Sequence, residues 1–374
     1  MRGDGRGLVP RADVARAVLV PFVLARVLVG GALAISRHLV EQLHVSPVPI
    51  QIDQGLMAWD AAFYRDIAAS GYDGVAAEGL RFFPLVALLG RVVALLPGVD
   101  AELGVLLIAN LSALAFGFVF YALAWRERGD EAFARRAVWL AYLVPPAFVL
   151  VMGYAEATVM LLAALTLLAL RSRRWWLAAV TGYLAGLARP VGVLLAVPAL
   201  VEVIQHRRTM TRAELGGRIT AVVAPFAGLF TYLAWASDRG DGFLYPLRVQ
   251  EDPERRGSWK FPVTNVIDAA RDAGADRVSA GVHVVAAMLL IVLLVVLIRR
   301  WPASYSCYAG AVLVLALSAS NLDSLERYGL STLPFLLAGA DVTDAPDAER
   351  VVLVLAAAGL VVAAVLAFTG ILVP

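Results

Sequence analysis

A polar stretch between residues 51 and 84 interrupts a chain that is otherwise almost continuously apolar. It contains the carboxylate best placed for chemistry, Asp60, which directly follows Trp59. A carboxylate beside aromatic rings at a membrane–water boundary is partly desolvated, and desolvation raises its pKa toward values that suit a general base. We therefore predict that Asp60 removes a proton from a substrate hydroxyl. The alternative is structural, because an aspartate at the start of a helix also stabilises that helix.

The residues around Asp60 have the spacing of a short helix. The stripe that carries Asp60 also carries Tyr64. The adjacent stripe is apolar and consists of Trp59, Phe63 and Ile67. We expect this helix to lie flat on a membrane with its apolar stripe toward lipid, and to end at Gly71. Trp59 and Tyr64 are predicted to contact the substrate.

Arginines next to breaks in the apolar segments form a second group of candidates. Arg189 precedes Pro190, which breaks the helix and either lets the arginine face a cavity or simply makes a turn between two short helices. Arg327 and Tyr328 lie at the mouth of an apolar segment, where a planar guanidinium could bind a phosphate. The alternative for Arg327 is a side chain that extends to lipid headgroups and pairs with Glu326.

Further polar candidates lie in a tight turn and in a long loop. Glu156 shares a turn between two apolar segments with Tyr154. A carboxylate at the mouth of a membrane cavity is costly unless it is used or paired, so we expect Glu156 either to orient sugar hydroxyls or to pair with Arg189. The loop 238–279 offers side chains that could contact a sugar or a phosphate: Gln250, Arg255, Trp259 and Lys260.

Composition places these residues in a membrane protein. Of 374 residues, 60% are hydrophobic. The mean hydropathy is +0.76, which predicts a polytopic, all-α membrane protein. A net charge of +2 gives no basis for binding nucleic acid. The single cysteine, Cys307, excludes an intramolecular disulfide, and the four histidines lack the spacing of a metal site. No cofactor is expected, apart from a divalent ion that Asp53 and Asp60 could hold together.

Eleven apolar segments are candidates for membrane-spanning helices, which need about 20 apolar residues. The clearest are 14–36, 101–125, 217–237, 280–298, 303–320 and 350–372. The shorter ones are 137–152, 154–170, 175–188, 190–204 and 328–341. The segment 82–97 has Arg91 in its middle and is interpreted as an interfacial or half-inserted helix.

Basic residues indicate how these segments are oriented. With eleven spans and the N-terminus inside, every cluster of arginines falls on the inner side, as the positive-inside rule requires. The acidic connector 341–349 is the one inner loop that lends no support. The same orientation places all the candidate segments on the outer side: residues 37–100, the turn 153–156, Arg189, the loop 238–279 and the turn 321–327.

An ordered set of motifs resembles a known family. The chain contains WDAAFYRDIAASGY and RFFPL, followed by GYAEA, LARPVG and SLERYGLSTLPF. Together they are similar to the signature of the PIG-V-like glycosyltransferases, the GPI mannosyltransferase II family and its prokaryotic relatives, within the GT-C superfamily. The resemblance implies that Asp60 is a key residue for sugar transfer, and that Arg327 and Tyr328 belong to a serine-arginine-tyrosine element. It also implies a polyprenyl-monophosphate sugar donor and no obligatory metal.

These observations predict a GT-C-like bundle of about 11 transmembrane helices in one domain over residues 1–374, with interfacial helices in the first outer loop. The expected function is transfer of a sugar, mannose by resemblance, from a polyprenyl phosphate to a lipid or glycan acceptor on the outer face of the cell membrane. Arg327, Arg189 or Lys260 would stabilise the departing phosphate. Two alternatives stay open: a transporter or flippase of a lipid-linked sugar, and a noncatalytic partner in a glycosylation complex.

Overall fold

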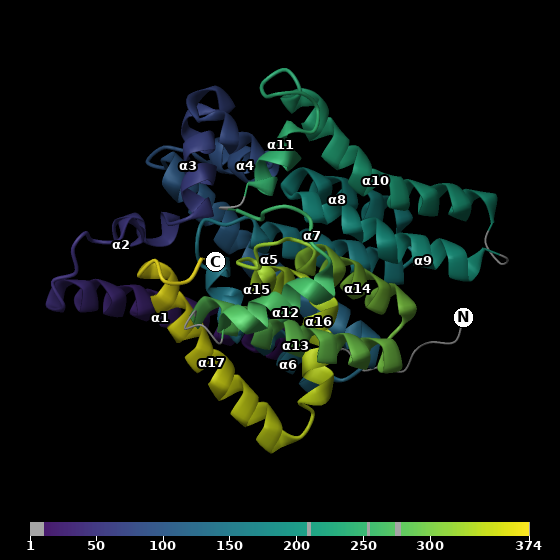
Figure 1. Ribbon diagram of the computed structural model, residues 1–374. Coiled ribbons are helices and arrows are strands. Elements are labelled where there is room, and N and C mark those ends of the chain that lie inside the picture. The colour runs from purple at the N-terminus through teal and green to yellow at the C-terminus, as the bar shows by residue number, and fades with distance from the viewer. Residues whose placement is uncertain (1–10, 208–210, 253–254, 274–277, 374) are drawn as a thin grey trace.

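The computed structural model describes residues 11–207, 211–252, 255–273 and 278–373, and the elements in these ranges are helices (Figure 1). In the described ranges, the strand-like pairing is one bridge between Trp259 and Ala319. The all-α class predicted from composition is therefore confirmed.

Five helices among the described residues are long and apolar enough to cross a membrane. They are α1 (Arg11–Gln42), α5 (Ala101–Arg128), α10 (Arg212–Ala236), α13 (Val278–Arg300) and α17 (Pro346–Phe368). Their most apolar windows have mean hydropathies of 1.6 to 3.1. Large apolar side chains such as Val27, Val285 and Val354 are exposed on them, as contact with lipid tails requires.

The remaining predicted spans correspond to shorter helices. These are α6 (Glu131–Leu143), α7 (Glu156–Arg171), α8 (Trp175–Ala188), α9 (Ala196–His206), α14 (Ala303–Leu317) and α16 (Leu333–Val342). Prolines shorten two of them, because the 3-10 helices η4 (Pro145–Leu150) and η5 (Pro190–Leu195) replace α-helix after α6 and before α9. Helix α7 is apolar and buried almost all round, which suits the interior of a bundle.

The segment between α1 and α5 consists of short helices. They are α2 (Ile50–Gln54), η1 (Gly55–Met57), α3 (Asp60–Ser70), η2 (Tyr72–Gly74), η3 (Ala77–Arg81) and α4 (Pro84–Val93). Helix α4 is only 10 residues long, as predicted for the segment 82–97. It buries Val86 and Ala87 and exposes Leu88 and Val92, the one-sided apolar exposure of an interfacial helix.

Helix α3 does not turn its aromatic stripe toward lipid, so that prediction is wrong. The ring of Phe63 stacks on Phe82 with centroids 4.5 Å apart. The indole N–H of Trp59 donates to the carbonyl of Ala367 at 3.0 Å. Protein covers the stripe because the RFFP segment folds back onto it and the end of α17 approaches it. The predicted helix end is confirmed, since Gly71 follows α3 with φ 75°.

The segment between α10 and α13 contains α11 (Tyr245–Arg248), η6 (Val249–Glu251) and α12 (Pro262–Ala273). It is tied to the chain before α15 (Leu325–Ser331) by backbone hydrogen bonds, including Lys260 N–H to Ser318 C=O and Ser320 N–H to Ser258 C=O. These bonds bring two segments that are far apart in sequence to the same end of the bundle.

Candidate active site

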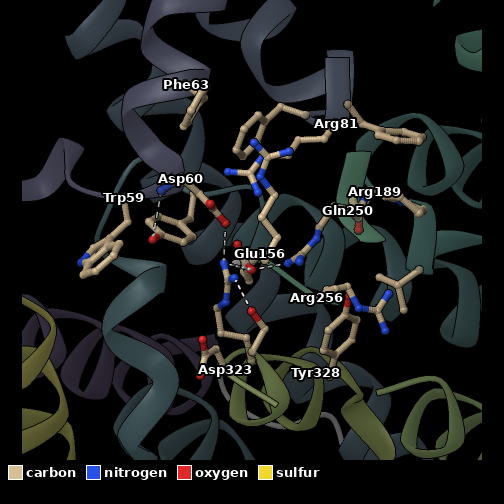
Figure 2. A pocket seen from close by; sticks show the side chains of 18 of the residues that line it. Trp59, Asp60, Phe63, Arg81, Glu156, Arg189, Gln250, Arg256, Asp323 and Tyr328 are labelled. Atoms are coloured by element: carbon tan, nitrogen blue, oxygen red, sulfur yellow. Dashed lines mark hydrogen bonds and ion pairs between the residues drawn. The ribbon is translucent and has the colours of Figure 1, made fainter. Parts of the chain in front are cut away.

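A pocket of about 360 Å³ lies where the α1–α5 and α10–α13 segments meet the ends of α7, α8 and α15 (Figure 2). Most of its described lining comes from residues 59–64, 81–83, 154–156, 189–191, 250, 255–256 and 321–328. No one of these segments could enclose a substrate alone, so the pocket is a product of the tertiary fold.

Four charged side chains that the sequence singled out form a continuous chain of ion pairs in this pocket. Arg327 Nη1 donates to Asp60 Oδ2 at 2.8 Å and to Glu156 Oε1 at 3.2 Å. Arg189 Nη1 donates to the same Glu156 oxygen. Glu156 and Arg327 are buried. Two carboxylates and two guanidiniums balance one another, which offsets much of the cost of desolvating them.

The structure shows where the side chains of both arginines lie. Arg327 is only 7% exposed and lies in the pocket, so it does not extend to lipid headgroups. Its neighbour Glu326 lies 2.8 Å from Nδ1 of His283 instead of pairing with Arg327. Arg189 has extended backbone at the break between α8 and η5, and its side chain enters the pocket because Pro190 starts a new helical turn there.

Asp60 is held at the first position of α3 and makes no capping hydrogen bond with its side chain. The preceding Trp59 has φ 60° and ψ −129°, a conformation that costs a non-glycine residue about 1–3 kcal/mol. Two hydrogen bonds hold the turn at Trp59 and Asp60 in place. The first runs from the Asp60 N–H to Tyr154 Oη at 3.3 Å. The second ties the turn that carries Tyr154 to η1, because the Gly153 N–H donates to the carbonyl of Leu56 at 3.1 Å. Strain of this kind is typical of positions where a fold orients a functional side chain.

The pKa of Asp60 is shifted in the direction opposite to our expectation. Desolvation by burial raises the pKa, but the charges of Arg327, Arg81 and Arg189 and the hydrogen bond from Arg327 together outweigh desolvation. The pKa therefore lies below its ordinary value of 3.8. The expectation was wrong because it considered the aromatic neighbours and not the cations that the fold brings to the carboxylate. Asp60 is ionised in neutral solution, as a base must be, but its basicity is reduced.

Most of the other candidate contact residues reach the pocket. Those that line it are Trp59, Tyr64, Tyr154, Gln250, Arg255 and Tyr328. The structure does not bring Trp259 and Lys260 there. Trp259 is 74% exposed, and Lys260 Nζ pairs with Asp268 Oδ2 on α12 at 2.8 Å. Trp259 forms the bridge to Ala319, and the backbone N–H of Lys260 donates to the carbonyl of Ser318, so this part of the loop pairs with the chain before α15.

Known proteins resemble the chain in structure more than in sequence. No protein-family model matches it, and no curated protein does. Among solved structures, ArnT from Cupriavidus metallidurans bound to undecaprenyl phosphate superposes with a TM-score of 0.50 and 18% identity. The match covers 79% of this chain and 58% of ArnT. The oligosaccharyltransferase of Archaeoglobus fulgidus gives a TM-score of 0.45 and 13% identity, over 91% of this chain and 53% of that one.

The chain has the GT-C fold. It spans little more than half the length of these two GT-C proteins. A fold shared at this level of identity says how the backbone is arranged, so the chemistry has to be argued from the pocket itself.

Sequence reasoning missed several residues that line the pocket: Arg81, Arg256, Asn321 and Asp323. For Arg81 a signal existed, because it begins the RFFPL motif in a segment already assigned to the site. Asp323 lies 3.3 Å from Nε2 of His283 on α13. Nothing in the sequence indicated this contact, because the two residues lie far apart along the chain.

The structure does not bring Asp53 into the pocket that Asp60 lines. Asp53 is exposed on α2 and does not line the pocket. Within the described ranges, no group of three or more His, Cys, Asp or Glu side chains is arranged to hold a metal ion. The cations that surround Asp60 are arginines.

Proposed function

We propose that this chain is a membrane glycosyltransferase whose donor is a sugar linked to a polyprenyl monophosphate. The observation that carries the proposal is an ionised carboxylate, Asp60, held among arginines in a pocket at one end of an apolar helical bundle. The reaction needs a base for the acceptor and cations for the leaving phosphate. A lipid-linked substrate also accounts for a pocket beside membrane-spanning helices. The GT-C fold, shared with an ArnT that was crystallised with undecaprenyl phosphate, supports this choice.

The motifs that resemble the PIG-V-like family extend the proposal to mannose as the sugar and to a lipid or glycan as the acceptor. In this proposal residues 1–374 form one catalytic domain, and the outer segments 37–100 and 238–279 close the pocket. The reaction would then be a step of glycolipid biosynthesis.

The proposed transfer is a single displacement at the anomeric carbon. Asp60 takes the proton of the acceptor hydroxyl while the hydroxyl oxygen attacks that carbon. The bond between the anomeric carbon and the phosphate oxygen breaks, and polyprenyl phosphate leaves with the electron pair. Arg327 occupies Oδ2 of Asp60, so the acceptor approaches Oδ1, which accepts no hydrogen bond from any residue that the structure describes.

Incubation of the purified protein with labelled polyprenyl-phosphate mannose tests this function. We expect transfer to an added acceptor, or slow hydrolysis to mannose and polyprenyl phosphate when acceptor is absent. A donor that binds and is never turned over, with every acceptor offered, would favour the transporter or the noncatalytic partner instead.

The lowered pKa of Asp60 predicts the pH dependence of the reaction. Because the folded-state pKa lies below 3.8, the carboxylate stays ionised as the pH falls to about 5. We expect kcat/KM to stay constant between about pH 5 and 7. Protonation of Asp60 should reduce it only at lower pH. A pH–rate profile in a buffer of constant ionic strength measures this. An acidic limb near pH 6 that Asp60→Glu displaces would contradict the assignment.

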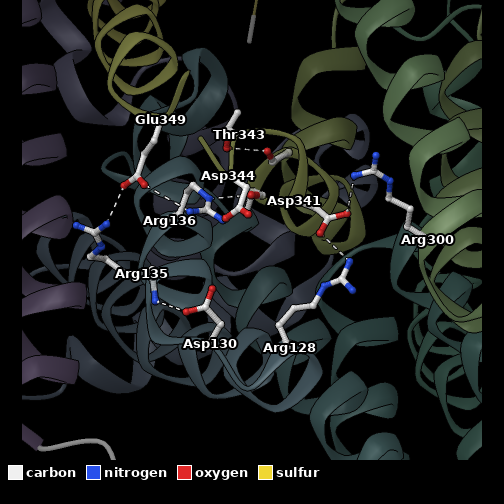
Figure 3. Close-up of polar contacts among 12 residues, drawn as sticks. Arg128, Asp130, Arg135, Arg136, Arg300, Asp341, Thr343, Asp344 and Glu349 are labelled. Carbon is white, nitrogen blue, oxygen red and sulfur yellow. Dashed lines mark hydrogen bonds and ion pairs between the residues drawn. The ribbon is translucent and has the colours of Figure 1, made fainter. Parts of the chain in front are cut away.

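We also propose that the pocket faces the outside of the cell. Helix α7 runs from Glu156 in the pocket to Arg171, which pairs with Glu127 near the end of α5, so these helices have a basic end opposite the pocket. The acidic connector lies at the same end, because its Asp341 pairs with Arg128 in the last turn of α5 (Figure 3). It pairs there with the clustered arginines: Arg128 with Asp341 at 2.7 Å, Arg136 with Asp344 at 2.6 Å and Arg135 with Glu349 at 3.0 Å. The connector therefore neutralises a basic surface and does not argue against the positive-inside rule.

Cysteine labelling checks this orientation. Asp73 in η2 and Asp347 in α17 are fully accessible positions at opposite ends of the bundle, with side chains 91% and 97% exposed. In a Cys307→Ala background, Asp73→Cys should react with an impermeant thiol reagent in intact cells. Asp347→Cys should react only after the membrane is permeabilised. The reverse pattern would place the pocket on the inner face.

A further inference from the structure

The arginines of the pocket differ in how their charges are compensated. Counted over the described residues, the lining contains Arg81, Arg189, Arg255, Arg256 and Arg327 against Asp60, Glu156 and Asp323. Arg189 and Arg327 bond to carboxylates, as described above. Arg255 bonds to Glu78 and to a backbone carbonyl, and Arg256 donates to the carbonyl of Leu315 at 2.9 Å.

Arg81 has no such partner. No described residue accepts a hydrogen bond from its side chain, and its Nε is buried without an acceptor. Its guanidinium lies 4.6 Å from the ring centroid of Phe82 and 5.3 Å from that of Phe63. Aromatic faces stabilise a cation, but they leave the five N–H donors of an arginine unsatisfied. A buried N–H without an acceptor, such as that of Nε, is costly, and an anion in the pocket would satisfy it together with the terminal N–H donors.

The position of Arg81 suits an anion that takes part in the reaction. Figure 2 shows Arg81 on the same side of the pocket as Asp60 and Phe63, with Arg256 and Tyr328 on the opposite side. Burial lowers the pKa of Arg81, and the nearby charge of Asp60 offsets only part of this effect. A second negative charge beside Arg81 would favour its charged form further.

We propose that Arg81 binds the phosphate of the polyprenyl-linked substrate, whereas Arg327 remains with Asp60 and Glu156 and orients the base. This inference rests on the proposed function, because it assigns the phosphate contact of the same site. During transfer, the phosphate oxygen released from the anomeric carbon gains negative charge. The planar fork of Arg81 can then make two parallel charge-assisted hydrogen bonds that strengthen in the transition state.

Binding of undecaprenyl phosphate to the purified protein tests the assignment without needing turnover. We expect Arg81→Gln to weaken the affinity about 10–100-fold, which corresponds to the loss of hydrogen bonds to a charged group. Arg81→Lys should recover part of the affinity, because it restores the charge without the fork. Undecaprenol, which has the same tail without phosphate, should bind parent and Arg81→Gln equally. Both variants should unfold at the parental temperature, because Arg81 makes no hydrogen bond that holds the fold together.

The matched control is Arg65→Gln. Arg65 lies on α3, pairs with Asp66 at 2.9 Å and does not line the pocket, so its loss should leave the affinity unchanged. If the parent binds undecaprenyl phosphate and Arg81→Gln binds it equally well, the assignment of Arg81 is overturned while the proposed function stands. If the parent binds undecaprenyl phosphate no better than undecaprenol, the donor class in the proposed function fails together with this assignment.

Discussion

Asp60→Asn is expected to reduce turnover about 10²–10⁴-fold, with donor binding largely retained. Asparagine has nearly the same size as aspartate, but it cannot take a proton from the acceptor hydroxyl at neutral pH. The fold should survive, because Asp60 does not cap α3 and Arg327 keeps its bond to Glu156. Turnover of labelled donor and the affinity for undecaprenyl phosphate, measured on the same preparation, separate chemistry from binding.

Asp66→Asn is the matched control for this prediction. Asp66 lies on the same helix, pairs with Arg65 and is 48% exposed, so its replacement should leave turnover unchanged. Asp53→Asn provides a second comparison, because Asp53 is the other carboxylate early in the outer segment and does not line the pocket. If Asp60→Asn turns over within about threefold of the parent, the barrier has changed by less than about 1 kcal/mol. That result would show that Asp60 is not the base.

Glu156→Gln is expected to destabilise the protein by about 3–5 kcal/mol, the cost of leaving buried charges without their partner. Glu156 is 1% exposed and accepts hydrogen bonds from both Arg189 and Arg327. Glutamine keeps the shape but removes the charge. Arg189 would then have no carboxylate partner among the described residues, and Arg327 would keep only Asp60. Thermal unfolding of the purified protein in detergent should show a transition well below that of the parent.

Glu78→Gln tests whether burial is the cause of this effect. Glu78 also pairs with an arginine of the pocket, Arg255, but its side chain is 55% exposed. An exposed pair of this kind contributes about 0–1 kcal/mol, so Glu78→Gln should unfold close to the parent. If both variants lower the unfolding temperature by the same small amount, water reaches Glu156 and the chain of ion pairs does not hold the pocket together.

The sequence by itself determined where the helices lie and which polar segments interrupt them. Each of the eleven predicted segments contains a helix, although only five described helices reach the length of a span. It also picked out Asp60, Glu156, Arg189 and Arg327, which come from four segments and meet in one pocket. This was possible because apolar length, proline breaks and the cost of a charge near a membrane are local properties, readable from a few neighbouring residues.

The tertiary structure alone decided the electrostatics of the site. Whether the pKa of Asp60 rises or falls depends on which cations approach it, and Arg327 lies 267 positions further along the chain. The tertiary fold also decided what covers the aromatic stripe of α3, which packs against the RFFP segment. It likewise decided the partner of Lys260, which pairs with Asp268 outside the pocket. Charge–charge interactions fall off over a few ångströms and vary strongly with burial. The spacing of residues in a sequence carries almost no information about such distances until the fold brings the segments together.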